Sequence, residues 1–276
     1  MMFVTRLISG IIIVILALGF TIVGGYSLAL ALFIVSAIGL FEFYRATGVK
    51  KTEPKINALE VVGFCGMLVY YVVLISPAAE QFLLLTLISL PILLMFVYVF
   101  SFPKHTAGEV MAAFFGIVYV PVMLSFIYMT RMLPYGHYIV WLIFISSWIN
   151  DTCAYCTGML IGKHKLAPRL SPKKSIEGSV GGVIGAAIVA GLFGYFVVES
   201  AVANQTITWS FILIGAVGAV VAQIGDLAAS AIKRNYDLKD YGKLIPGHGG
   251  ILDRFDSVIF TAPMIYLLAD ILISLR

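Results

Sequence analysis

FLLLTLISLPILLMFVYVFS, residues 82–101, runs without a charged side chain. An α-helix needs about 17–25 predominantly apolar residues to cross a hydrocarbon core of about 30 Å. Residues 82–101 therefore predict a membrane-spanning helix. The composition points the same way, because 61% of the 276 residues are hydrophobic and 12% are charged, whereas soluble domains contain about 45–50% and about 25%.

Further apolar runs have the same character at residues 7–23, 26–44, 59–76, 110–130, 137–161, 179–198, 207–232 and 256–274. The first run follows Arg6 in the manner of a signal peptide. Gly24-Gly25-Tyr26 is not a small-x-small cleavage site, however, so we expect this helix to be retained. We expect an all-α integral membrane protein with about nine transmembrane helices.

Lys and Arg residues near the ends of the spans predict the orientation, because cytoplasmic loops carry an excess of both. With a cytoplasmic N-terminus, all of the 18 basic residues except Arg131 and Arg276 fall on the cytoplasmic side. These charges then face anionic headgroups or anionic ligands at the membrane. We therefore expect no nucleic-acid partner.

Ionisable residues divide the chain into two parts. Residues 1–105 have few of them, with Glu42 and Glu60 near span ends, and we expect this part to be a scaffold. Residues 106–276 place three acidic residues inside spans: Asp151, Asp226 and Asp270. A charge at the bilayer centre costs about 2.5–3.5 kcal/mol on insertion scales, so it usually faces a cavity or a partner. We expect a polar active-site cavity on the cytoplasmic side of this C-terminal catalytic region.

Small residues recur four apart in GSVGGVIGAAIVAGLFG, residues 178–194. Examples are the pairs Gly178/Gly182 and Gly181/Gly185. This spacing lets membrane helices approach closely, so we expect the span to pack tightly against a neighbouring helix.

A polar face runs down the span that ends near residue 232. At 100° per residue, five polar side chains fall on one stripe of a helix: Gln223, Asp226, Ser230, Lys233 and Arg234. The alternative is that Asp226 and Lys233 simply neutralise each other, although two helical turns separate them by about 10.5 Å.

The loop KLIPGHGGILDRFDS, residues 243–257, follows that helix. Its glycines allow backbone N–H groups to approach an anion closely, although their spacing matches neither of the common phosphate-loop patterns. Asp253 and Asp256 share a face at the start of the next span. With Asp226 they could hold a cation such as Mg²⁺, which takes oxygen ligands. The alternative for Asp253 and Asp256 is helix capping, which does not explain Asp226.

A second polar loop, HKLAPRLSPKKSIEGS at residues 164–179, carries four cations: Lys165, Arg169, Lys173 and Lys174. An ordinary positive-inside loop would account for the number of charges. It would not account for the Ser-Pro and Ser-x-Glu-Gly that flank the lysines. With Arg234 and Arg254, this loop predicts a basic, cation-binding site suited to a polyphosphate and a lipid phosphate together.

The segment from Ser230 to Asp256 reads S-x-x-K-R-x4-K-D-x-G-x3-P-G-H-G-G-x-x-D-R-x-D. It resembles the signature of the phosphatidate cytidylyltransferase family, also called CDP-diacylglycerol synthases. The likeness covers roughly the last 130 residues, and it extends to Asn150-Asp151-Thr152-x-Ala154-Tyr155-x-x-Gly158, Ser171-Pro172-Lys173-Lys174-Ser175-x-Glu177-Gly178 and Gly225-Asp226-Leu227. It implies transfer of a cytidylyl group from CTP to phosphatidate, giving CDP-diacylglycerol and pyrophosphate for phospholipid biosynthesis. It also implies Mg²⁺ as cofactor, with a second cation possible.

The resemblance also implies roles for single residues. We expect Asp226 and Asp253 to hold Mg²⁺, with Asp256 as a further ligand or the partner of one. Six cations are candidates for phosphate contacts: Lys173, Lys174, Lys233, Arg234, Lys239 and Arg254. His248 joins the catalytic set as a phosphate contact, the alternatives being a general acid or a residue that orders the loop. Further site residues are Asn150, Asp151, Ser171, Ser175, Glu177, Ser230, Asp240, Gly249 and Gly250.

The expected partners are CTP, phosphatidate and membrane lipids, with a homodimer as a further expectation. The expected location is the bacterial inner membrane, with the active site facing the cytoplasm. A transporter is one alternative, but it should show inverted repeats or broken helices in both halves. A CTP-dependent lipid kinase acting on a polyprenol is the other, and it would need a base to deprotonate its alcohol.

Overall fold

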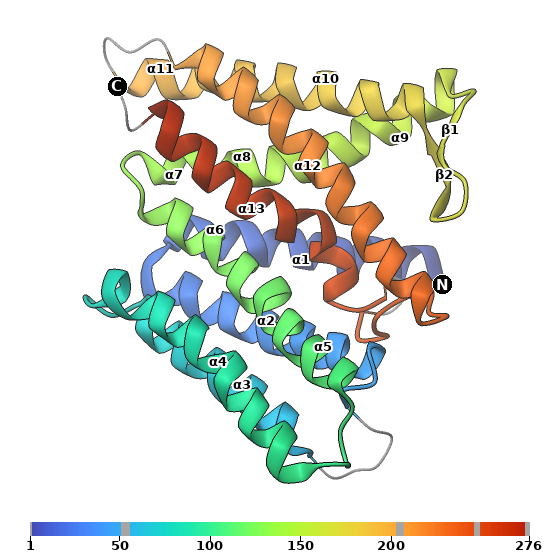
Figure 1. Ribbon diagram of the computed structural model, residues 1–276. Helices are drawn as coiled ribbons and strands as arrows, with labels where there is room; N and C mark the ends of the chain where they lie inside the picture. The colour runs from blue at the N-terminus through green and yellow to red at the C-terminus, as the bar shows by residue number, and fades with distance from the viewer. Residues whose placement is uncertain (1, 51–55, 203–206, 246–248, 274–276) are drawn as a thin grey trace. The chain divides into compact units, whose positions relative to one another are not determined.

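The computed structural model describes residues 2–50, 56–202, 207–245 and 249–273, most of them helical (Figure 1). The helices are α1 (Met2–Val23), α2 (Gly25–Ala46), α3 (Ala58–Leu74), α4 (Ala79–Ser101), α5 (Ala107–Ile117), α6 (Met123–Met132), α7 (Gly136–Ile139), α8 (Trp141–Phe144), α9 (Asn150–Ile161), α10 (Ile176–Phe193), α11 (Glu199–Ala201), α12 (Thr208–Asn235) and α13 (Leu252–Ile273). Strands β1 (Lys165–Ala167) and β2 (Ser171–Ser175) form an antiparallel hairpin, with Lys165 opposite Ser175. The second polar loop is thus a hairpin.

Three π-helical turns join neighbouring helices into longer rods. Val118–Val122 links α5 to α6, Ile145–Ile149 links α8 to α9, and Gly194–Val198 links α10 to α11. Pro121 lies in the first of these turns, where its missing N–H removes one bond of the regular α ladder. The expected spans 110–130, 137–161 and 179–198 are therefore helical, but they are not uniform α-helices.

Within the described residues, each apolar run expected from the sequence is helical over nearly all of its length. Among the described residues, seven helices are long and apolar enough to cross a membrane: Gly25–Ala46, Ala79–Ser101, Ala107–Met132, Gly136–Ile161, Ile176–Ala201, Thr208–Asn235 and Leu252–Leu272. Two apolar helices are shorter, Gly10–Val23 and Ala58–Leu74. The 17 residues of the second lie at the lower end of the length that spans a hydrocarbon core. The chain is an all-α integral membrane protein that carries one small hairpin.

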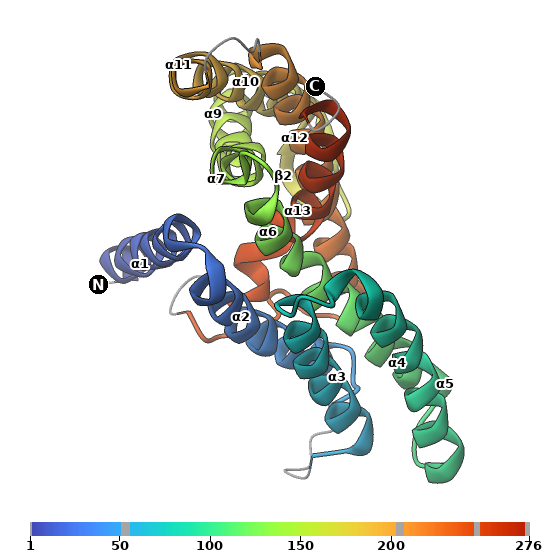
Figure 2. The same cartoon turned by 90° about the vertical axis from the view of Figure 1, so that its left-hand side faces the viewer.

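The chain packs as two units. Unit one comprises Met1–Tyr128 with Tyr236–Arg254. Its helices α3 and α4 lie side by side (Figures 1 and 2). Tyr44 of α2 is fully buried and donates its hydroxyl to the Ala113 carbonyl of α5 at 2.9 Å. Glycine takes the place of larger residues where α3 passes the Tyr44 ring, since a Cβ on Gly63 would collide with it.

Unit two comprises Met129–Asn235 with Phe255–Arg276. Helix α10 lies along α9 and α12 (Figure 1). A Cβ on Gly182 of α10 would meet the Asn150 Oδ1 at 2.5 Å and the Ala154 Cβ at 2.9 Å, both on α9. The close packing expected for residues 178–194 is thereby confirmed. The functional boundary after residue 105 stays a prediction, since the two packing units follow a different division.

Candidate functional site

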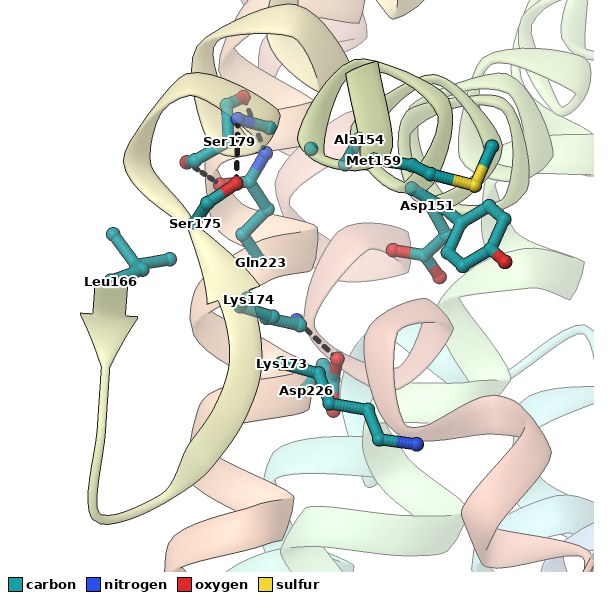
Figure 3. Close-up of a pocket in the computed structure, with 13 residues that line it drawn as sticks. Asp151, Ala154, Met159, Leu166, Lys173, Lys174, Ser175, Ser179, Gln223 and Asp226 are labelled. Atoms are coloured by element: carbon teal, nitrogen blue, oxygen red, sulfur yellow. Dashed lines mark hydrogen bonds and ion pairs between the residues drawn. The ribbon is translucent and has the colours of Figure 1, made fainter. Parts of the chain in front are cut away.

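A cavity of about 350 Å³ lies within unit two (Figure 3). Its volume falls in the usual range of small-molecule sites, about 300–1,000 Å³. Helices α9, α10 and α12 and the hairpin contribute its lining: Asp151, Ala154, Tyr155, Gly158, Met159, Leu166, Lys173, Lys174, Ser175, Gly178, Ser179, Gln223 and Asp226. The cavity thus brings together predicted site residues from three separate stretches of the sequence.

The hairpin supplies the cations of this cavity. Lys174 on β2 forms an ion pair with Asp226 on α12, and each side chain is 26% exposed. Asp226 also accepts a hydrogen bond from Ser230 at 3.5 Å. Lys173, the preceding residue of the strand, also lines the cavity (Figure 3). Lys173 and Lys174, which the alternative assigns to an ordinary positive-inside loop, therefore line a cavity that also contains an acidic residue.

Glu177 and Ser175 anchor the hairpin to α10. The Glu177 carboxylate accepts the backbone N–H of Lys163 at 3.0 Å and that of His164 at 3.2 Å, and it bonds the His164 ring. The Ser175 hydroxyl caps α10 by accepting the Gly178 N–H at 3.2 Å. A capped N-terminus satisfies one of the unpaired donors of the first turn. Glu177 thus ties the residues just before β1 to the first turn of α10, and Ser175 caps α10 at the end of the strand that carries Lys173 and Lys174.

A chain of polar side chains joins three helices at the cavity wall. The Gln223 amide on α12 donates to the Asn150 Oδ1 on α9 at 2.7 Å and to the Ser179 carbonyl on α10 at 3.0 Å. The Ser179 hydroxyl donates to the Gln223 Oε1. Asn150 in turn donates to Asp151 Oδ1 at 3.2 Å. The buried amides are satisfied by one another, and they orient the acidic residue on the α9 side of the cavity.

A second acidic residue of unit two approaches Asp226. Helices α12 and α13 come close at Gly225, where a Cβ would meet the Asp256 carbonyl at 3.0 Å and the Phe260 Cβ at 2.9 Å. Asp256 lies within electrostatic reach of Asp226, Lys233 and Asp151. Asp226 and Asp256 therefore lie on two helices that approach each other at Gly225.

Asp253 has a different environment, in unit one. It is 7% exposed, and its Oδ2 accepts three backbone N–H groups, from Tyr241 at 2.8 Å, Gly250 at 2.9 Å and Gly242 at 3.4 Å. All three donors precede α13, so these bonds close the loop onto Asp253 and differ from the helix-capping bonds of the alternative. The Gly250 N–H is engaged by this carboxylate. A role for Asp253 at Mg²⁺ stays a prediction.

The other predicted residues occupy the surface or the ends of elements. Four of them are exposed: Arg234, Lys239, Asp240 and Arg254. Lys233 and Ser171 are half-buried. Gly249 has φ +85°, a left-handed conformation that glycine adopts without strain, so its presence is required by the turn. His248 lies outside the described residues.

Sequence reasoning missed the contacts of one residue in the expected scaffold, Glu42. Glu42 on α2 is 3% exposed, and it accepts the N–H groups of Ile251 at 3.1 Å and Leu252 at 2.9 Å. An acidic residue at the end of an apolar span was the available signal, because a buried charge requires partners. Nothing in the residues around Glu42 indicated which segment, more than 200 residues away, supplies these partners.

Mg²⁺ usually binds proteins through one or two carboxylates together with substrate phosphates and waters. Within the part of the chain that the structure describes, no cluster of three Asp, Glu, His or Cys side chains forms a ready metal cage. The Asp226 and Asp256 pair is an oxygen donor set of the size that Mg²⁺ takes when a phosphate supplies the rest. The residues present therefore fit a cation that arrives with its substrate.

Comparison with known proteins extends the likeness to both units. Residues 4–272 match the family model described as the cytidylyltransferase family. A phosphatidate cytidylyltransferase of Staphylococcus haemolyticus is 32% identical over 267 residues, which cover 95% of this chain and 97% of the relative. One of Bacillus subtilis is 32% identical over 271 residues, covering 95% and 96%. One of Staphylococcus aureus is 31% identical over 263 residues, covering 95% and 97%.

Proposed function

The chain belongs to the cytidylyltransferase family, and from this premise we propose that it transfers the cytidylyl group of CTP to phosphatidate. The products are CDP-diacylglycerol, for phospholipid biosynthesis, and pyrophosphate. The observation that carries the proposal is the cavity lined by Lys173 and Lys174, in which Lys174 pairs with Asp226 on a membrane helix. A reaction between a triphosphate and a lipid phosphate needs such cations, close to a membrane, to offset the crowded negative charge.

The chemistry makes few demands beyond charge and position. A phosphatidate oxygen forms a bond to the α-phosphorus of CTP, the bond from that phosphorus to the β-phosphate oxygen breaks, and pyrophosphate leaves. A phosphate monoester has its second pKa near ~6, so the attacking oxygen is largely ionised at neutral pH. The protein therefore needs no dedicated base, and its task is to hold the reacting oxygens in line.

In the proposal, acidic residues hold the metal and basic residues contact the phosphates. Asp226, Asp253 and Asp256 hold Mg²⁺, and a second cation where the enzyme takes one. Bound Mg²⁺ supplies charge neutralisation at the phosphates. Six cations contact phosphate: Lys173, Lys174, Lys233, Arg234, Lys239 and Arg254. His248 donates a hydrogen bond to a phosphate oxygen. The oxygen donors on α12 and α13 and the lysines of the hairpin support this division.

The proposed location is the bacterial inner membrane, with the N-terminus and the active site on the cytoplasmic side. The distribution of Lys and Arg supports it. A reporter fused after Arg276 should then lie outside the cytoplasm, and one inserted within residues 45–58 should lie inside. Cytoplasmic signal from both would refute this topology. The homodimer stays a prediction, which light scattering of the detergent-solubilised protein would check.

The test of function is product identity. Purified protein receives CTP labelled at the α-phosphate or at the γ-phosphate, with phosphatidate or a polyprenol as acceptor. We expect α-label in CDP-diacylglycerol and no γ-label in lipid. γ-Label in a polyprenyl phosphate would identify a lipid kinase instead. Absence of label from both lipids would overturn the proposal.

A further inference from the structure

Helix α2 holds the loop of unit one that precedes α13, here taken as residues 241–245 and 249–252. Glu42 accepts the N–H groups of Ile251 and Leu252 at the end of this loop. One helical turn further on, Arg45 donates to the Tyr241 carbonyl at its beginning, at 2.7 Å. Residues three apart lie on the same face of a helix. One face of α2 therefore hydrogen-bonds to both ends of the loop.

The loop is shaped around the Glu42 carboxylate. A Cβ added to Gly242 or to Gly250 would collide with that carboxylate. Both positions lie in the predicted motif, where larger residues would push the loop away from α2. The two glycines therefore serve the fit to Glu42, in addition to any role toward a ligand.

Glu42 and Asp253 accept different backbone N–H groups of the same loop. Asp253 ties the beginning of the loop to its end through the N–H groups of Tyr241, Gly242 and Gly250. Glu42 takes the next two donors, those of Ile251 and Leu252. Hydrogen bonds to an ionised carboxylate are about twice as strong as neutral ones. Glu42, a residue of the expected scaffold, therefore holds the start of α13. Asp253 follows directly on this first residue of the helix.

We propose that Glu42 is a positioning residue for the cytidylyl transfer. It acts through Gly242 and Gly250, the two loop glycines that pack against its carboxylate, and through the first turn of α13. This inference rests on the proposed function. A misplacement of about 1 Å costs on the order of 10²-fold in rate. The effect should fall on kcat and on the Mg²⁺ dependence, because the loop leads directly into the first turn of α13, where Asp253 is assigned to the metal and Arg254 to phosphate.

The test is Glu42→Gln, which keeps the size of the side chain. The amide can accept one N–H, but its NH₂ group faces the second donor and cannot accept it. We expect kcat for CDP-diacylglycerol formation to fall on the order of 10²-fold, the Mg²⁺ requirement to rise, and amide hydrogen exchange at Ile251 and Leu252 to accelerate. Wild-type kcat in folded Glu42→Gln would overturn the proposal.

Glu60→Gln is the matched control. Glu60 is a carboxylate of the same unit, 2% exposed, which binds Lys50 and caps α3. Its kcat per folded molecule and its amide exchange at residues 249–252 should match the wild type. An equal loss of kcat in both variants would show a general stability effect and overturn the proposal.

Arg45→Gln keeps the proposal testable where Glu42→Gln does not fold. Arg45 is exposed, and its loss removes the hydrogen bond to the Tyr241 carbonyl and the contact with the Phe41 ring while leaving the Glu42 carboxylate in place. A lowered kcat with unchanged KM for CTP would support the proposal, and wild-type kcat would overturn it. Absence of product with the wild-type protein would refute the proposed function. Amide exchange would still decide whether Glu42 holds the loop.

Discussion

In the cavity of unit two, Asp226 is 26% exposed and meets a side-chain cation. In the loop of unit one, Asp253 is 7% exposed and accepts backbone N–H groups. The pairing with Lys174 depends on a flexible side chain, which can leave when a ligand offers a better partner. The bonds of Asp253 belong to the fold itself. Two aspartates that the sequence predicts for the same metal site thus differ in how freely they can exchange partners.

The largest effect should come from Asp226→Asn. Loss of this charge removes an oxygen donor for Mg²⁺ and the partner of Lys174, so we expect CDP-diacylglycerol formation to fall on the order of 10²–10³-fold. Thermal unfolding should change little, since the residue is partly exposed. A rate and a Mg²⁺ dependence near those of the wild type would remove Asp226 from the metal site. Asp270→Asn, at an exposed position of the same unit, is the control and should retain full activity.

Asp253→Asn tests whether the aspartate of the loop binds Mg²⁺ as well or only closes the loop. If Asp253 binds Mg²⁺, the activity of the Asp253→Asn variant should also fall steeply. The double variant with Asp226→Asn should then lose far less activity than the product of the two single losses. If Asp253 only closes the loop, Asn should retain most activity, because its side-chain oxygen can still accept backbone N–H groups of the loop. Mg²⁺ titration of both single variants and the double variant separates the two outcomes.

Replacing Lys173 and Lys174 together with Gln should have the next largest effect. A hydrogen bond to a charged group contributes about 1.5–3 kcal/mol, so KM for CTP or for phosphatidate should rise roughly 10-fold or more. Lys165→Gln, on the partner strand of the hairpin, is the matched control and should leave both values near those of the wild type. Unchanged kinetics in the double variant would return the lysines to an ordinary positive-inside role.

Gln223→Met tests the polar wall of the cavity. Methionine has a similar length, but it leaves the Asn150 Oδ1 and the Ser179 carbonyl without their donor. An unsatisfied buried polar group costs about 1–3 kcal/mol, so the free energy of unfolding should fall by about that amount. Denaturation in detergent measures it. An unchanged stability would show that these bonds are not needed to join the three helices.

Glu177→Gln should have the smallest effect. The change weakens the hold on the Lys163 and His164 N–H groups, so the strand that carries Lys173 and Lys174 becomes less well ordered. We expect KM for CTP to rise about twofold, as is usual for contacts near solvent, with kcat unchanged. Glu199→Gln, at another carboxylate that binds backbone N–H groups, serves as the control. A large fall in kcat would place Glu177 among the reacting groups.

Local pattern predicted the helices well. The apolar runs carry their own signal in composition and length, and within the described residues each is helical over nearly all of its length. The small residues at i and i+4 likewise predicted the close contact at Gly182, because the spacing alone defines a helix face. The motif residues Lys174, Asp226 and Gln223 were recognised one by one, and they line one cavity.

Contacts between distant segments could not be predicted in the same way. A helix period shows that Asp226 lies on a polar stripe, but it does not identify Lys174 as its partner. Glu42 was visible as a charge in an apolar span, yet nothing in its neighbourhood indicated Ile251 and Leu252. Such pairings depend on how whole elements pack. They are absent from the local pattern of one chain.

The π-helical turn at Ile145–Ile149 bears on how this chain aligns with others. A π turn holds one residue more than an α turn, and one residue corresponds to about 100° of rotation. A helical wheel drawn straight through this turn therefore assigns Asn150 and Asp151 to the wrong face. Gain or loss of a single residue here re-aims both side chains without breaking the span. Chains that differ by one residue at this point should differ in what lines the cavity, even where their motifs are identical.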